Sequence, residues 1–206
     1  MGLKAESGVL DEEAQIFERF HRKLEIIRNK GLDCQGSEAH RFKLAPPIEE
    51  SEVERFELFH GISLPSDYRD FLTLFAAGGA GPEYGIFPLS KHADFIAGHI
   101  ARLDHDGTGW VLPSDFLSRP CPFLPGWNEV SDESVDSLET VPFCGTIKIG
   151  GNDSLLSDIL LIVSGVCRGR VATVDWQSFS THVVDEPNFL TWYEAWLDSV
   201  IKGTSP

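Results

Sequence analysis

The chain has 206 residues, of which 42% are hydrophobic and 24% are charged. This length and composition are typical of one soluble globular domain with a substantial core, and no apolar run approaches the roughly 20 residues of a membrane-spanning helix. Seventeen basic residues against 32 acidic ones give a net charge of −15, which disfavours nucleic acid as a partner because phosphates require a basic surface.

The same acidity favours encounter with a basic protein, although it also serves solubility alone. The N-terminal segment has no apolar stretch long enough for a signal peptide, so we expect a cytoplasmic protein. The cysteines, Cys34, Cys121, Cys144 and Cys167, are far apart and form no C-x-x-C pair. We therefore expect reduced thiols, with neither a zinc site nor a disulfide scaffold.

Residues 11–30 show apolar residues at helical spacing and predict an amphipathic helix that precedes Gly31. The polar stretch that follows, which ends at Pro46 and Pro47, predicts a linker. We expect residues 1–45 to form an N-terminal extension and residues 46–206 the main domain, the two packing as one unit. The apolar face predicted for the first helix contains Ile16, Phe17, Phe20, Leu24 and Ile27.

A second helix is predicted after Pro47 and ends at Gly61, with Val53, Phe56 and Phe59 facing inward and its glutamates, Glu57 included, mostly outward. A third begins at Pro65, since proline is tolerated at the first helical position. The buried stripe predicted for this helix contains Tyr68, Phe71, Leu72 and Phe75.

Gly78, Gly79 and Gly81 follow this third helix. Phosphate-binding loops have the opposite order, because the glycines must precede the N-terminus of a helix. We therefore interpret the glycines as structural, with Gly78 or Gly79 as the left-handed cap of the helix.

The second half of the chain is rich in short β-forming segments. "YGIFPL" predicts a short strand and residues 92–103 a weak helix. Three runs, at 143–150, 159–165 and 169–176, are separated by glycine-containing turns and predict consecutive hairpins of an antiparallel sheet. Residues 187–201 predict a strong closing helix, one face of which contains Phe189, Trp192, Tyr193, Trp196, Val200 and Ile201. Helices first, strands late and a final helix define an α+β fold, with helices at both ends and a mostly antiparallel sheet.

Residues 104–115, "DHDGTGWVLPSD", align with a calcium-binding loop through Asp104, Asp106, Thr108 and Asp115. The last position is Asp rather than the bidentate Glu, and Pro113 lies inside the loop, so an ordinary Asp/Gly turn is the alternative. His92, His99 and His105 lack zinc-binding spacing, and no nucleophile motif such as G-x-S-x-G is present. We expect neither catalysis nor a cofactor.

The segment "EVSDESVDSLE" at 129–139 contains five acidic residues and no basic one. It predicts either a solvated loop or an acidic docking patch for a basic partner. The residues of this predicted patch are Glu129, Asp132, Glu133, Asp136 and Glu139.

The order of these elements resembles that of the SUKH superfamily, the Smi/Knr-like domain. The resemblance spans about residues 46–200. In the first part it rests on V-x-x-F-E at 53–57, Gly61, "LPSDYRDFL" at 64–72 and "GIFPL". In the later part it rests on the hairpin "GGNDSLLSDILL", on "GRVATVDW" and on the closing "NFLTWYEAWL". The signature positions are Leu64, Pro65, Tyr68, Phe71, Leu72, Gly78 and Gly79.

This resemblance implies a domain that binds proteins and does not catalyse a reaction. Bacterial relatives are mostly immunity proteins that neutralise polymorphic toxins, commonly nucleases, and fungal relatives regulate cell-wall synthesis. An immunity protein that masks a basic toxin domain is the leading hypothesis, and a regulatory adaptor without any toxin is the alternative.

Overall fold

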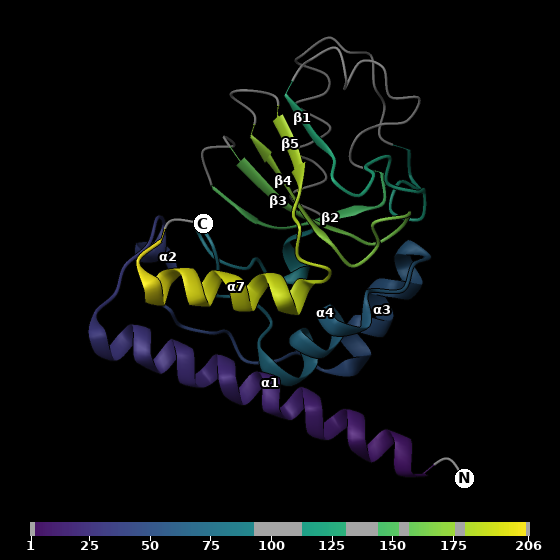
Figure 1. The fold of residues 1–206 in the computed structure, drawn as a ribbon. Coiled ribbons are helices and arrows are strands. Elements are labelled where there is room, and N and C mark those ends of the chain that lie inside the picture. The colour runs from purple at the N-terminus through teal and green to yellow at the C-terminus, as the bar shows by residue number, and fades with distance from the viewer. Residues whose placement is uncertain (1–2, 93–112, 131–143, 153–156, 176–179, 205–206) are drawn as a thin grey trace.

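A computed structural model of the chain describes residues 3–92, 113–130, 144–152, 157–175 and 180–204 (Figure 1). It has an α+β fold in which helices come first, strands follow and a helix closes the chain, as predicted. The described helices are α1 (Leu3–Lys30), α2 (Ser37–His40), α3 (Glu50–His60), α4 (Ser66–Asp70), a π-helix (Phe71–Phe75), a 3₁₀ turn (Leu89–Lys91) and α7 (Phe189–Lys202), and the strands are β1 (Asn128–Val130), β2 (Thr146–Gly151), β3 (Ser157–Ile162), β4 (Val171–Asp175) and β5 (Ser180–Val183).

The strands form one antiparallel sheet in the order β1-β5-β4-β3-β2. From β2 to β5 each strand pairs with the next in sequence. The pairs β2–β3 and β3–β4 confirm the predicted hairpins, whereas β5 was not predicted. The short strand β1 pairs with β5 at the outer edge and was not predicted. A bulge between Lys148 and Gly150 shifts the register of β2 against β3.

Both faces of the sheet are covered. One face, which includes Ile147 and Ile159, joins the helices in the main core. The other, which includes Leu160 and Ile162, packs with Phe123 from the segment that precedes β1. All six residues of β2 are therefore buried, as strands covered on both sides require.

Helix α1 begins at Leu3, eight residues earlier than the predicted start. Its predicted apolar face is confirmed, because Phe17, Phe20, Leu24 and Ile27 are buried in the main core. In Figure 1, α7 runs between α1 and the sheet. Charged side chains also join these two helices: Arg19, Lys23, Glu194 and Asp198 form a network of ion pairs.

Helix α7 carries the aromatic centre of the core. Its Tyr193 is fully buried and donates a hydrogen bond of 2.9 Å from its hydroxyl to the carbonyl of Ala80. Asn188 caps the helix by accepting from the Thr191 backbone N–H at 2.9 Å. Burial of the predicted face is confirmed for Phe189, Trp192, Tyr193, Trp196 and Val200.

Two predictions of local structure differ from the structure, and a third is not tested by it. The predicted linker before Pro46 contains the short helix α2. "YGIFPL" forms only an isolated bridge from Ile86 to Gly79, followed by the 3₁₀ turn. The helix predicted at 92–103 lies, apart from His92, outside the described residues.

Candidate functional site

The predicted acidic patch falls largely outside the described residues. Of its members only Glu129 is placed: its backbone lies in β1 and pairs with Thr181 of β5 at the outer edge of the sheet. Asp132, Glu133, Asp136 and Glu139 lie outside the described residues. The docking role of this segment therefore stays a prediction.

The calcium-loop prediction is equally incomplete. Asp104, Asp106 and Thr108 lie outside the described residues. Asp115 is placed in a turn, where its carboxylate forms an exposed ion pair with Arg119 at 2.9 Å. Among the residues that the structure does describe, no group of three or more His, Cys, Asp or Glu side chains is arranged to hold a metal ion.

The signature segment 64–72 joins α3, α4 and α7. Glu57 of α3 accepts a hydrogen bond of 2.7 Å from the Leu64 backbone N–H and forms an ion pair with Arg69 of α4. Asp67 accepts from the Leu190 backbone N–H at 3.2 Å and so covers the N-terminus of α7. These contacts make the polar signature residues structural links between the helices.

The apolar signature residues form the centre of the core. Tyr68, Phe71 and Leu72 are at most 1% exposed. The rings of Tyr68 and Phe71 each lie 4.9 Å from that of Phe189 in edge-on geometry, which aromatic pairs favour. Leu64 and Pro65 are also buried.

Gly78 and Gly79 do not cap the helix, and this prediction was wrong. The π-helix ends where Ala76 adopts an extended conformation, before either glycine is reached. Gly79 has a φ of 100° and bridges two chain segments, so a Cβ there would lie 2.3 Å from the carbonyl oxygen of Lys43. A Cβ on Gly78 would lie 2.8 Å from the carbonyl oxygen of Ile86. The glycines are required by close backbone approach.

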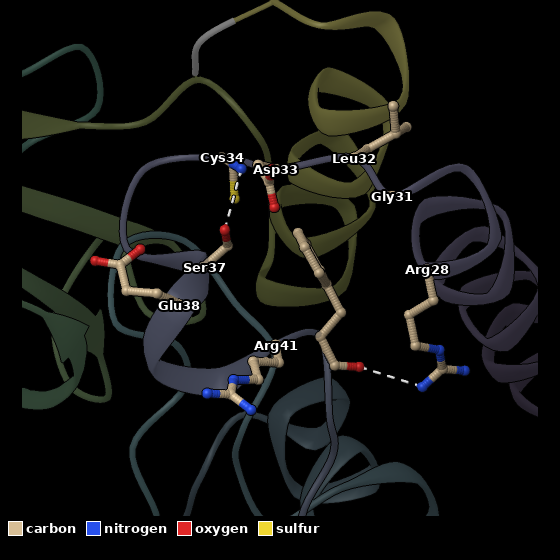
Figure 2. Close-up of a pocket in the computed structure, with 9 residues that line it drawn as sticks. Arg28, Gly31, Leu32, Asp33, Cys34, Ser37, Glu38 and Arg41 are labelled. Carbon is tan, nitrogen blue, oxygen red and sulfur yellow. Dashed lines mark hydrogen bonds between the residues drawn. The ribbon is translucent and has the colours of Figure 1, made fainter.

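A pocket of about 590 Å³ lies between the end of α1 and α2 (Figure 2). Its two arginines, Arg28 and Arg41, are matched by Asp33 and Glu38, so the lining favours neither sign of charge. Arg28 donates to the Phe42 carbonyl at 3.2 Å and so stabilises the chain turn at the edge of the pocket. This pocket has a clear structural role.

The thiols offer no activated nucleophile. Burial raises the pKa of Cys121 to about 12, and it also raises the pKa of Cys34, Cys144 and Cys167. A thiol with a raised pKa stays protonated at neutral pH and reacts slowly. All four cysteines are free, as expected for reduced thiols.

The most unusual exposed feature is an apolar pair near the end of α3. Leu58 is 85% exposed and Phe59 is 84% exposed. We had expected Phe59 to face inward with Val53 and Phe56, and this was wrong. At about 100° per residue, Phe59 lies about 120° around the helix from Val53, whereas Glu57 lies only about 40° away. The angle, rather than hydrophobicity alone, would have identified Phe59 as exposed and Glu57 as inward.

A groove of about 400 Å³ lies beside this pair, between α3 and the segment 88–90. Phe59 forms one of its walls, and Phe56 and His60 line it as well. The rings of Phe56 and His60 lie 4.5 Å apart, and each is 5.3 Å from the ring of His92. We call Leu58, Phe59 and this groove the α3 surface; the groove is lined by Ile48, Glu52, Arg55, Phe56, Phe59, His60, Ala77, Pro88, Leu89 and Ser90.

Glutamates surround the start of the same helix. Glu49, Glu52 and Glu54 are exposed, and Glu50 is exposed but forms an ion pair with Arg69. Arg55 is the single Lys or Arg within α3, and its Nε donates to the Ser51 carbonyl at 3.3 Å. Acidic side chains therefore border an apolar surface.

The fold is of the α+β class, with an antiparallel sheet covered by helices. A family model described as the SMI1 / KNR4 family (SUKH-1) matches residues 47–153, just over half of the chain. The chain belongs to this family. The matched range is shorter than the 46–200 of our resemblance, and it contains α3, α4 and β2 but not α7. No curated protein sequence matches the chain.

The family consists of immunity and regulatory domains and is generally a non-catalytic binding module. Among the described residues, no helix is long and apolar enough to cross a membrane.

Proposed function

We propose that the protein is a cytoplasmic immunity protein that binds a basic toxin domain and masks its surface without catalysing a reaction. The observation that carries this proposal is the exposed glutamates of α3, on a chain with a net charge of −15. Membership of the SMI1 / KNR4 family supports it, because the family contains immunity domains.

The physical logic is electrostatic. A toxin that acts on nucleic acid needs a basic surface to hold phosphates. An acidic inhibitor is steered to that surface, and the resulting complex covers the residues that contact the substrate. The acidic residues of the predicted patch at 129–139 would add to the same negative potential.

Co-expression with the toxin domain encoded beside its gene tests the proposal. We expect the protein to restore growth, and killing that is equal with and without it would refute the proposal. A locus without a neighbouring toxin gene would favour a regulatory adaptor instead.

Charge reversal tests the acidic surface itself. The variant Glu49→Lys/Glu52→Lys/Glu54→Lys should slow association with the toxin about tenfold at low salt, with a smaller effect at high salt. A matched variant reverses the exposed Glu18, Glu25 and Asp33, which lie on and just after α1. It should slow association less, because these charges lie away from the proposed interface.

A further inference from the structure

Two adjacent large apolar side chains on α3 are almost fully in contact with water. Leu58 and Phe59 are 85% and 84% exposed, whereas most of the other phenylalanines that the structure describes are buried. Single exposed apolar residues are ordinary, but Phe59 also lines a groove, and exposed apolar surface at a groove is typical of an interaction site.

The groove beside Phe59 is built on a firmly held helix. Glu57, on the opposite side of α3, is tied both to Arg69 and to the Leu64 backbone N–H. Phe56 packs edge-on against the buried His92 at 5.3 Å. An apolar groove on a rigid element loses little entropy when a partner side chain enters it.

Charge identifies the kind of partner. Glu52 and Arg55 both line the groove, and Glu49 and Glu54 are exposed on the same turn or the next, so carboxylates outnumber arginines around it. Arg55 is the single Lys or Arg of α3, and His60 ends the helix. A partner segment that carries Lys or Arg around an apolar side chain complements this arrangement, whereas an acidic segment would be repelled.

We propose that the α3 surface is the apolar anchor site for a protein partner, and that it takes an apolar side chain flanked by basic residues. This inference rests on the proposed function and deepens it: the glutamates attract the basic partner, and Leu58, Phe59 and the groove hold it. Central apolar contacts surrounded by charge are the usual arrangement of an interface hot spot.

The test uses the full chain and a defined probe. The probe is an amphipathic helical peptide with lysines on one face and leucines on the other, and its control has serines in place of the leucines. Binding is measured by fluorescence anisotropy, and the site is mapped by chemical-shift changes in the isotope-labelled protein. We expect the leucine peptide to bind more tightly than the serine peptide and to shift residues 56–60.

Substitutions locate the anchor. Leu58→Ala and Phe59→Ala should each weaken leucine-peptide binding about tenfold, within the range of interface hot spots. Both side chains are exposed, so folding should be unaffected. The matched control is Val166→Ala, which truncates another exposed apolar residue, 76% exposed, in the turn after β3. It should leave binding unchanged.

Three outcomes would overturn the inference. The serine peptide could bind as tightly as the leucine peptide, which would leave the acidic surface without an apolar anchor. Neither peptide could bind, which would overturn the anchor site. The proposed function would be judged separately, by toxin neutralisation in the co-expression experiment. Finally, the protein could form dimers that Phe59→Ala abolishes, which would make a second copy of the chain, rather than a basic partner, the occupant of the surface.

Discussion

The buried ion pair between β2 and β3 offers the sharpest test of how this fold is stabilised. The Lys148 ammonium lies 2.5 Å from the Asp158 carboxylate, and their side chains are only 5% and 1% exposed. The ammonium also lies 5.7 Å from the centre of the Phe87 ring. The substitution Lys148→Met keeps most of the aliphatic side chain and removes the charge.

The expected loss is large because the partner charge stays buried. Breaking a buried pair by removing one partner costs about 3–5 kcal/mol, since the remaining charge is uncompensated. For a chain of this size each kcal/mol lowers Tm by about 2–4 °C, so Lys148→Met should lower Tm by about 6–20 °C. Urea unfolding and thermal unfolding, both followed by circular dichroism, measure the two quantities.

Two further variants distinguish the cost of leaving a buried charge without its partner from the cost of losing any ion pair. Arg119→Met breaks the exposed pair with Asp115 and should cost at most about 1 kcal/mol. Lys148→Met/Asp158→Val removes both buried charges and should recover much of the loss, because replacing both partners by apolar groups is often neutral. If Lys148→Met cost less than about 1 kcal/mol, or if the double variant were no more stable than the single one, this reasoning would be refuted.

Three other predictions concern hydrogen bonds and pH. Glu57→Gln weakens the link to α4 and should cost about 1–3 kcal/mol in urea unfolding; an unchanged midpoint would show that the link is dispensable. Tyr193→Phe leaves the buried carbonyl of Ala80 without its donor and should cost about 1–3 kcal/mol, measured in the same way against wild type. Burial lowers the pKa of His40 and His60, so the unfolded chain takes up protons first on acidification. Their contribution to stability should be complete above about pH 6.5 and be lost as the pH falls below it; a Tm that does not fall between about pH 7 and pH 5 would contradict this.

The helices were predictable from the sequence because their periodicity is strong and local. Of the predicted face of α7 all residues but Ile201 are buried, although Leu190 and Leu197 are buried as well. Gly61 does end α3, in a left-handed conformation. The hairpins from β2 to β4 were predictable because glycine-containing turns separate short β-rich runs. β1 was missed because three residues, "NEV", carry no pattern and acquire their strand conformation from pairing with β5.

The candidate site could not be predicted in the same way. Composition identified the acidity of the chain, and the density of acidic residues suggested a docking patch at 129–139. The structure describes only residues 129 and 130 of that segment. Phe59 was assigned to the core on hydrophobicity, and only the angular position around α3 shows that it faces water. The glycine pair was recognised as structural, but its partners, Lys43 and Ile86, come from distant segments that no local pattern reveals.

Helix α3 packs against the rest of the domain on one side and, in our proposal, binds a partner on the other. On one side, Val53 is buried and Glu57 is tied to Arg69 and Leu64, so substitutions there would disturb the packing of α3 on α4. On the other side, Leu58 and Phe59 are both more than four-fifths exposed, so core packing constrains their identity little. A helix of this kind can change its outward residues, and with them its partner, without loss of the fold. The proposed anchor site therefore lies where partner specificity can vary at the least cost in stability.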